Sequence, residues 1–131
     1  MDGVESHERM VSVQVSEGGE AIKAIADEWD ALVPESFAAV FSRSAWCLAW
    51  LDTFKPKRLV LITARAGNRL VGVLPLVQIR TDARGLFFKQ VAPAAPGITD
   101  YQPPIVDPEM ASVALPAMLD AALGCFGRQG V

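Results

Sequence analysis

The residues best suited to chemistry are Thr99, Asp100 and Tyr101, which follow one another in a proline-rich stretch. A carboxylate beside a phenol can orient an amine or hydroxyl substrate or accept its proton. Burial would raise the pKa of the carboxyl from about 3.9 toward the pH of catalysis. The structural alternative is that Asp100 accepts backbone N–H bonds in a turn while the ring of Tyr101 packs on a neighbouring hairpin. The residue types leave both interpretations open.

Aromatic and basic side chains form a second group of candidates. Trp46 and Trp50 are four residues apart and could form the floor of a ligand pocket, although such a pair on an apolar helix is also typical of a core. Arg43 and Arg65 could each bind a phosphate or a carboxylate, or could simply be surface charges.

The sequence lacks the residues that other kinds of catalytic or binding site require. The only histidine, His7, lies in a polar segment that we predict to be a disordered leader (residues 1–9), so Ser–His–Asp and Cys–His mechanisms have no base. Cys47 and Cys125 are too few for a zinc site. We expect reduced, buried thiols and no metal, with a disulfide between the two as the alternative. No Walker or dinucleotide glycine pattern follows a predicted strand.

The totals indicate one globular domain. The chain has 131 residues, of which 51% are hydrophobic and 21% charged, with a net charge of −3. No basic stripe suggests a nucleic-acid partner. The N-terminus does not read as a signal peptide, and the longest apolar region, residues 113–126, is shorter than the ~20 residues of a membrane span. We therefore predict a cytoplasmic protein without a transmembrane segment.

The element that must position these residues is a hairpin of residues 59–64 and 70–77, closed by a turn at Gly67-Asn68. Both runs are apolar on their two alternating faces, which predicts strands covered on both sides. Pro75 cannot donate to a strand ladder, so with Gly72 it predicts a break in pairing at residues 72–75. An edge strand is the alternative.

The remaining elements cover or extend this hairpin. Residues 20–33 form an amphipathic helix, with Ile22, Ile25, Trp29 and Leu32 on one stripe. The helix after Asp107-Pro108 is expected to bend or restart at Pro116. Further elements are expected as follows: strands at residues 10–15, 86–91 and 105–106, and a helix at residues 44–54.

Four segments in this order resemble one protein family. They are residues 28–32 (EWDAL), 41–50 (FSRSAWCLAW), 69–76 (RLVGVLPL) and 99–101 (TDY). The chain from residue 10 to residue 131 resembles the N-terminal part of the CelD-like, or BioF2-like, acyltransferases of cellulose biosynthesis. These belong to the GNAT (Gcn5-related N-acetyltransferase) superfamily.

The resemblance implies an α/β (α+β) fold with a GNAT-like, mainly antiparallel sheet, as one part of a tandem-GNAT architecture. It implies acyl transfer, typically from acetyl-CoA, to an amine or hydroxyl of a saccharide, polymer or lipid precursor. Asp100 would be catalytic, and Thr99, Tyr101, Trp46, Trp50 and Arg43 would contact the acceptor. No CoA-binding turn precedes a helix here, so the donor site would need a C-terminal half or a partner. The alternatives are a non-catalytic, dimer-forming scaffold and FemAB-like aminoacyl transfer.

Overall fold

The sheet is built on a hairpin of two long strands, β2 (Arg58–Ala66) and β3 (Arg69–Ala83). The computed structural model describes residues 10–34, 42–55, 58–83, 86–93 and 105–126. Ala66 pairs with Arg69, so the connecting turn is Gly67-Asn68, as predicted. Gly67 has a φ of 63°, a backbone conformation that glycine adopts without steric cost.

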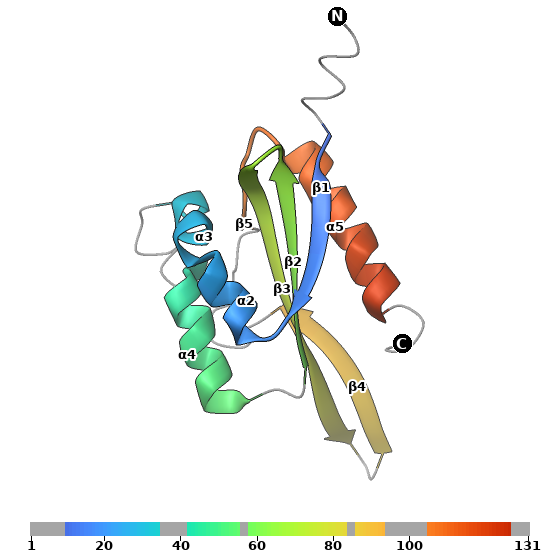
Figure 1. The fold of residues 1–131 in the computed structure, drawn as a ribbon. Helices are drawn as coiled ribbons and strands as arrows, with labels where there is room; N and C mark the ends of the chain where they lie inside the picture. The colour runs from blue at the N-terminus through green and yellow to red at the C-terminus, as the bar shows by residue number, and fades with distance from the viewer. Residues whose placement is uncertain (1–9, 35–41, 56–57, 84–85, 94–104, 127–131) are drawn as a thin grey trace, which may run out of the picture.

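Three further strands extend the hairpin into one antiparallel sheet (Figure 1). The strand order is β1-β2-β3-β4, and β5 also pairs with β3. The added strands are β1 (Ser12–Glu17), β4 (Leu86–Pro93) and β5 (Ile105–Val106). β1 begins and ends two residues later than expected, because Ser16 and Glu17 pair with Leu61 and Val60 of β2.

Helices cover both faces of the sheet, which confirms the expected mixed α/β class (Figure 1). α2 (Gly19–Ala24), α3 (Ala26–Leu32) and α4 (Ser44–Phe54) lie on one face, and α5 (Ala111–Phe126) lies on the other. Each face has its own apolar cluster. One contains Ile22, Trp29, Trp50, Leu61 and Val73, and the other contains Val60, Ile62, Val71, Ala114 and Met118. Residues 59–64 of β2 are all buried, as their sequence predicts.

A β-bulge in β3 explains why Gly72 is a glycine. Ala64 pairs with Gly72 and Arg65 pairs with Leu70, so Val71 is the extra residue. Val71 belongs to the cluster under α5, and a Cβ on Gly72 would also point to α5, 2.7 Å from Cε of Met118. Two consecutive positions therefore face α5, and the second must lack a side chain.

The expected disturbance of pairing occurs on both edges of β3. On the β2 edge it is the bulge at Val71, just before the predicted range, and Pro75 itself pairs with Leu61 in regular register. On the other edge, Gly72 and Val73 pair with β5, whereas pairing with β4 begins at Leu76. Pro75 therefore lies where β3 changes partner, a position that tolerates a residue without an N–H donor.

Two predicted helices differ from the observed ones. The helix expected at residues 20–33 is interrupted at Ile25, which has φ −119° and ψ 15°. The Ile25 N–H still donates to the carbonyl of Ile22, and the Ile25 carbonyl accepts the N–H of Trp29. The break therefore costs little backbone hydrogen bonding. The stripe that the predicted helix buries is nevertheless observed, across α2 and α3.

α5 begins at Ala111, after a turn in which Asp107 Oδ1 accepts the Glu109 N–H at 3.0 Å. The helix continues through Pro116 without the expected restart. Pro116 leaves the carbonyl of Ser112 without its helical donor, and Ser112 is exposed to water that can replace it. Within the described residues, no helix has the length and apolar character needed to cross a bilayer.

We predict that Gly72→Ala destabilises the fold by about 1–3 kcal/mol, because the new methyl group overlaps the buried end of Met118. Urea denaturation measures the change. Gly124→Ala in α5 is the matched control, since its Cβ meets nothing within 4 Å, and it should stabilise by up to about 1 kcal/mol. The loss caused by Met118→Ala should be smaller in the Gly72→Ala background. Wild-type stability of Gly72→Ala would contradict the close contact.

Candidate functional site

The three residues best suited to chemistry, Thr99, Asp100 and Tyr101, lie outside the described residues. The structure does describe the two strands that their connection joins. β4 ends with Pro93 opposite Leu76, and β5 begins with Ile105 opposite Val73. The connection therefore leaves the sheet and returns to it on the same edge of β3, on either side of Pro75.

Arg43 lies at a junction between α3 and the start of α4. Its Nη2 is 3.9 Å from Oδ2 of Asp30. The same carboxylate accepts the backbone N–H of Ser44 at 2.8 Å and the Ser44 hydroxyl at 3.0 Å. Trp29 adds a fourth contact, donating its indole N–H to the carbonyl of Ser42 at 2.8 Å. This constellation joins segments 13–14 residues apart in sequence, and it engages Arg43 with a carboxylate of its own chain.

Asp30 was not among the candidate residues of the sequence analysis. The sequence carries no local signal for this role, because Asp30 and the helix N-terminus that it serves lie in different helices. The N-cap of α4 is Arg43, which provides no side-chain acceptor for the helix N-terminus. A helix with such a cap needs an acceptor from elsewhere, and Asp30 supplies it.

The two candidate tryptophans occupy the interior on the side of α4. Trp50 is buried in the cluster beneath α2, α3 and α4, and Trp46 packs partly buried against the same cluster. Neither lines the two hollows described next. A role in the core, the alternative to a pocket floor, accounts for the packing of both tryptophans.

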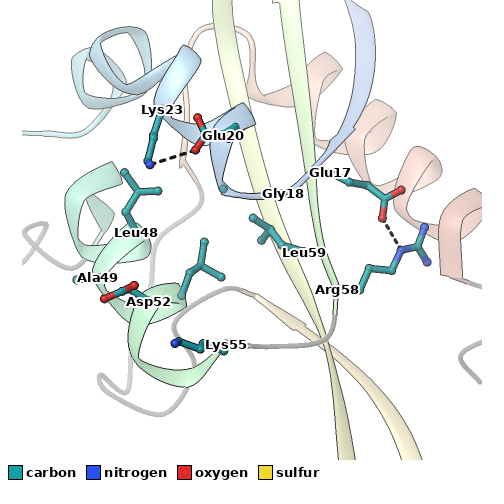
Figure 2. A pocket seen from close by; sticks show the side chains of 12 residues that line it. Glu17, Gly18, Glu20, Lys23, Leu48, Ala49, Asp52, Lys55, Arg58 and Leu59 are labelled. Atoms are coloured by element: carbon teal, nitrogen blue, oxygen red, sulfur yellow. Dashed lines mark hydrogen bonds and ion pairs between the residues drawn. The ribbon is translucent and has the colours of Figure 1, made fainter.

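The larger hollow is an open groove of about 770 Å³ between α4 and the segment that joins β1 to α2 (Figure 2). Its apolar part comprises Leu48, Ala49 and Leu51 of α4 with Leu59 of β2. Gly18 and Gly19 form the opposite wall, where the Gly18 N–H donates to the carbonyl of Leu59 at 3.2 Å.

The rim of this groove carries three acidic and three basic side chains: Glu17, Glu20, Asp52, Lys23, Lys55 and Arg58. Glu17 and Arg58 pair at 2.9 Å, and Glu20 and Lys23 pair at 3.2 Å (Figure 2). The rim is thus balanced in charge, and an ionic ligand would compete with these pairs.

The smaller hollow is a cleft of about 390 Å³ between the end of α3 and β5. It is lined by residues 31–34, by both residues of β5, and by Ser42 and Pro108. Among the described residues that line this cleft, no side chain is charged. The two hollows therefore differ in the ligand chemistry they admit.

The second candidate arginine, Arg65, is also engaged. Its guanidinium donates to both carboxylate oxygens of Glu28, at 2.7 and 3.0 Å, and to the carbonyl of Asn68 at 3.1 Å. The hydrogen bond from Arg65 holds the pKa of Glu28 below its usual value of 4.5. Arg65 thus braces the hairpin turn against α3.

Thiol and metal chemistry find little support in the described part of the chain. Cys47 and Cys125 are free, and burial raises the pKa of the Cys47 thiol to about 12, which keeps it protonated and poorly nucleophilic. The described residues contain no group of three or more His, Cys, Asp and Glu side chains placed to hold a metal ion.

Comparison of the chain with models of protein families, with curated proteins and with solved structures found no match in any of the three.

We predict that Asp30→Ala destabilises the protein by about 1–2 kcal/mol, because the N-terminus of α4 loses its acceptor and Arg43 loses its partner. Urea denaturation measures the loss. Asp27→Ala, an exposed carboxylate on the same helix, should change stability by no more than about 0.5 kcal/mol. Equal effects of the two variants would refute the capping role of Asp30.

We predict a pH-dependent contribution from the pair of Glu28 and Arg65. Because the folded-state pKa of Glu28 lies below its unfolded value of 4.5, the pair stabilises the fold above pH 4.5. That stabilisation is lost as the pH falls through the lower, folded-state pKa. Glu28→Gln should therefore be less stable than wild type near pH 7, and the two should converge in acid. The difference should also shrink in 1 M salt, and a constant difference from pH 7 to pH 2 would rule out the linkage.

Proposed function

We propose that this chain is the acceptor-binding part of a GNAT-like acyltransferase, a member of a tandem-GNAT architecture. It would transfer an acyl group, acetyl from acetyl-CoA in the simplest case, to an amine or hydroxyl of a saccharide or another cell-envelope precursor. In this proposal Asp100 orients the acceptor or removes its proton. Thr99 and Tyr101 contact the same molecule.

The observation that carries the proposal is the anchoring of one connection on β3. Thr99, Asp100 and Tyr101 lie between Pro93 and Ile105, which pair with Leu76 and Val73 of the same strand. A segment whose two ends are fixed beside the centre of a rigid sheet is a suitable carrier for reactive side chains. The antiparallel sheet, with helices on both faces, provides that support.

Arg43, Trp46 and Trp50 have a different role in this proposal. Arg43 holds the α3–α4 junction through Asp30, and the tryptophans pack in or against the core, so they support the acceptor side by position. The CoA part of the acyl donor would bind outside the described residues.

A transfer assay tests the proposal. The protein, purified from its own cells, is incubated with acetyl-CoA carrying a labelled acetyl group and with a saccharide fraction of the cell envelope. We expect label on an amine or hydroxyl, with hydroxylamine distinguishing the ester from the amide. Asp100→Asn should reduce the rate by about 10²-fold or more, the contribution typical of a general base, without changing the melting temperature.

Asp27→Asn is the control for that variant, since Asp27 is an exposed carboxylate of α3 and should leave the rate unchanged. A wild-type rate for Asp100→Asn would remove Asp100 from the catalytic step. No transfer from acetyl-CoA or a longer acyl-CoA to any acceptor would refute the acyltransferase proposal as a whole.

A non-catalytic interaction domain is the second candidate, and one observation favours it. Leu119 and Leu123, one helical turn apart on α5, are 55% and 68% exposed, an unusual exposure for two large apolar side chains on one helix. A stable dimer in sedimentation at micromolar concentration, from a protein that transfers no label, would support this function instead.

A further inference from the structure

The cleft between α3 and β5 has the chemistry of a hydrocarbon-binding site. Its volume of about 390 Å³ lies within the range of small-molecule sites, about 300–1,000 Å³. Leu32, Val33, Ile105 and Val106 provide branched apolar side chains on two elements far apart in sequence. The charged groove beside α4 has no such uniform lining.

Two of the backbone groups around the cleft are already paired within the protein. The Val33 N–H already donates to Asp30 O at 3.1 Å, and the Ser42 carbonyl already accepts the Trp29 indole N–H at 2.8 Å. Pro34 and Pro108 have no N–H at all. Each polar group of a peptide or sugar that is buried in the cleft without a partner would cost about 1–3 kcal/mol. A hydrocarbon chain has no such groups to satisfy.

We propose that this cleft binds the straight hydrocarbon chain of an acyl group or of a lipid-linked molecule. In its biological role the proposal rests on the acyltransferase function, because the chain would belong either to the acyl donor or to a lipid acceptor. Ile105 opens β5 and lines the cleft, so the bound chain would lie at the end of the connection that carries Asp100. The binding itself requires no turnover and can be measured alone.

A chain-length series tests the binding. Calorimetric titration with hexyl, heptyl, octyl and nonyl glucoside, each below its micelle concentration, should give an affinity that rises about fourfold with each methylene group. The rise should stop when the cleft is full. Affinities that do not depend on chain length would overturn the proposal.

Ala31 provides the variants, because it lines the cleft yet is exposed, so substitutions are tolerated by the fold. Ala31→Glu should weaken octyl glucoside binding at least tenfold, since it places a carboxylate against the chain. In Ala31→Leu the affinity for the glucosides should stop rising at a shorter chain length. Ala24→Glu is the matched control, an exposed alanine in the last turn of α2 away from the cleft. Equal losses in Ala31→Glu and Ala24→Glu would locate the binding elsewhere.

Octanoyl-CoA and acetyl-CoA separate the two sources of the chain. Ala31→Glu should weaken octanoyl-CoA more than acetyl-CoA if the chain is that of the donor. If the chain belongs to the acceptor, Ala31→Glu should weaken the binding of the glucosides alone. Chain-length-dependent binding without acyl transfer would refute the proposed function and leave the hydrocarbon site standing. Acyl transfer without chain-length-dependent binding would refute the hydrocarbon site and leave the proposed function standing.

Discussion

The structure depends on one constraint, that β2 and β3 are apolar on both faces and must be covered on both. A hairpin with one polar face could be covered by one layer of helices, whereas this one needs two. α5 on one side and α2, α3 and α4 on the other meet this need, and each side forms its own apolar cluster. The same requirement explains the bulge, because Val71 and Gly72 both face α5 and only a glycine leaves room for Met118.

The sequence predicts this framework because the relevant signals are local. Gly67-Asn68 between two apolar runs specifies the hairpin, and the stripe of Ile22 and Trp29 specifies the buried face of α2 and α3. What the sequence does not predict depends on distant partners. The interruption at Ile25 and the extension of β1 to Glu17 reflect packing and pairing, which outweigh local propensity.

The same distinction applies to the candidate site. That Trp50 contributes to a buried face could be read from helical spacing, whereas the partner of Arg43 could not, because Asp30 is in another helix. Both candidate arginines have carboxylate partners, Asp30 for Arg43 and Glu28 for Arg65. Residue type alone cannot distinguish an arginine that awaits an anion from one that already has a carboxylate. The distinction requires coordinates.

The two hollows lie at opposite ends of the α3–α4 layer and are built differently. The groove is walled by the β1–α2 segment and the C-terminal half of α4, where mutual ion pairs satisfy much of its charge. The cleft is walled by the end of α3 and by β5, whose two residues pair with Gly72 and Val73 and pack against the two apolar clusters. The bulge that admits Met118 immediately precedes this pairing, at Val71. Gly72 therefore lies against Met118 of α5 on one face of the sheet and also pairs with Val106, which lines the apolar cleft.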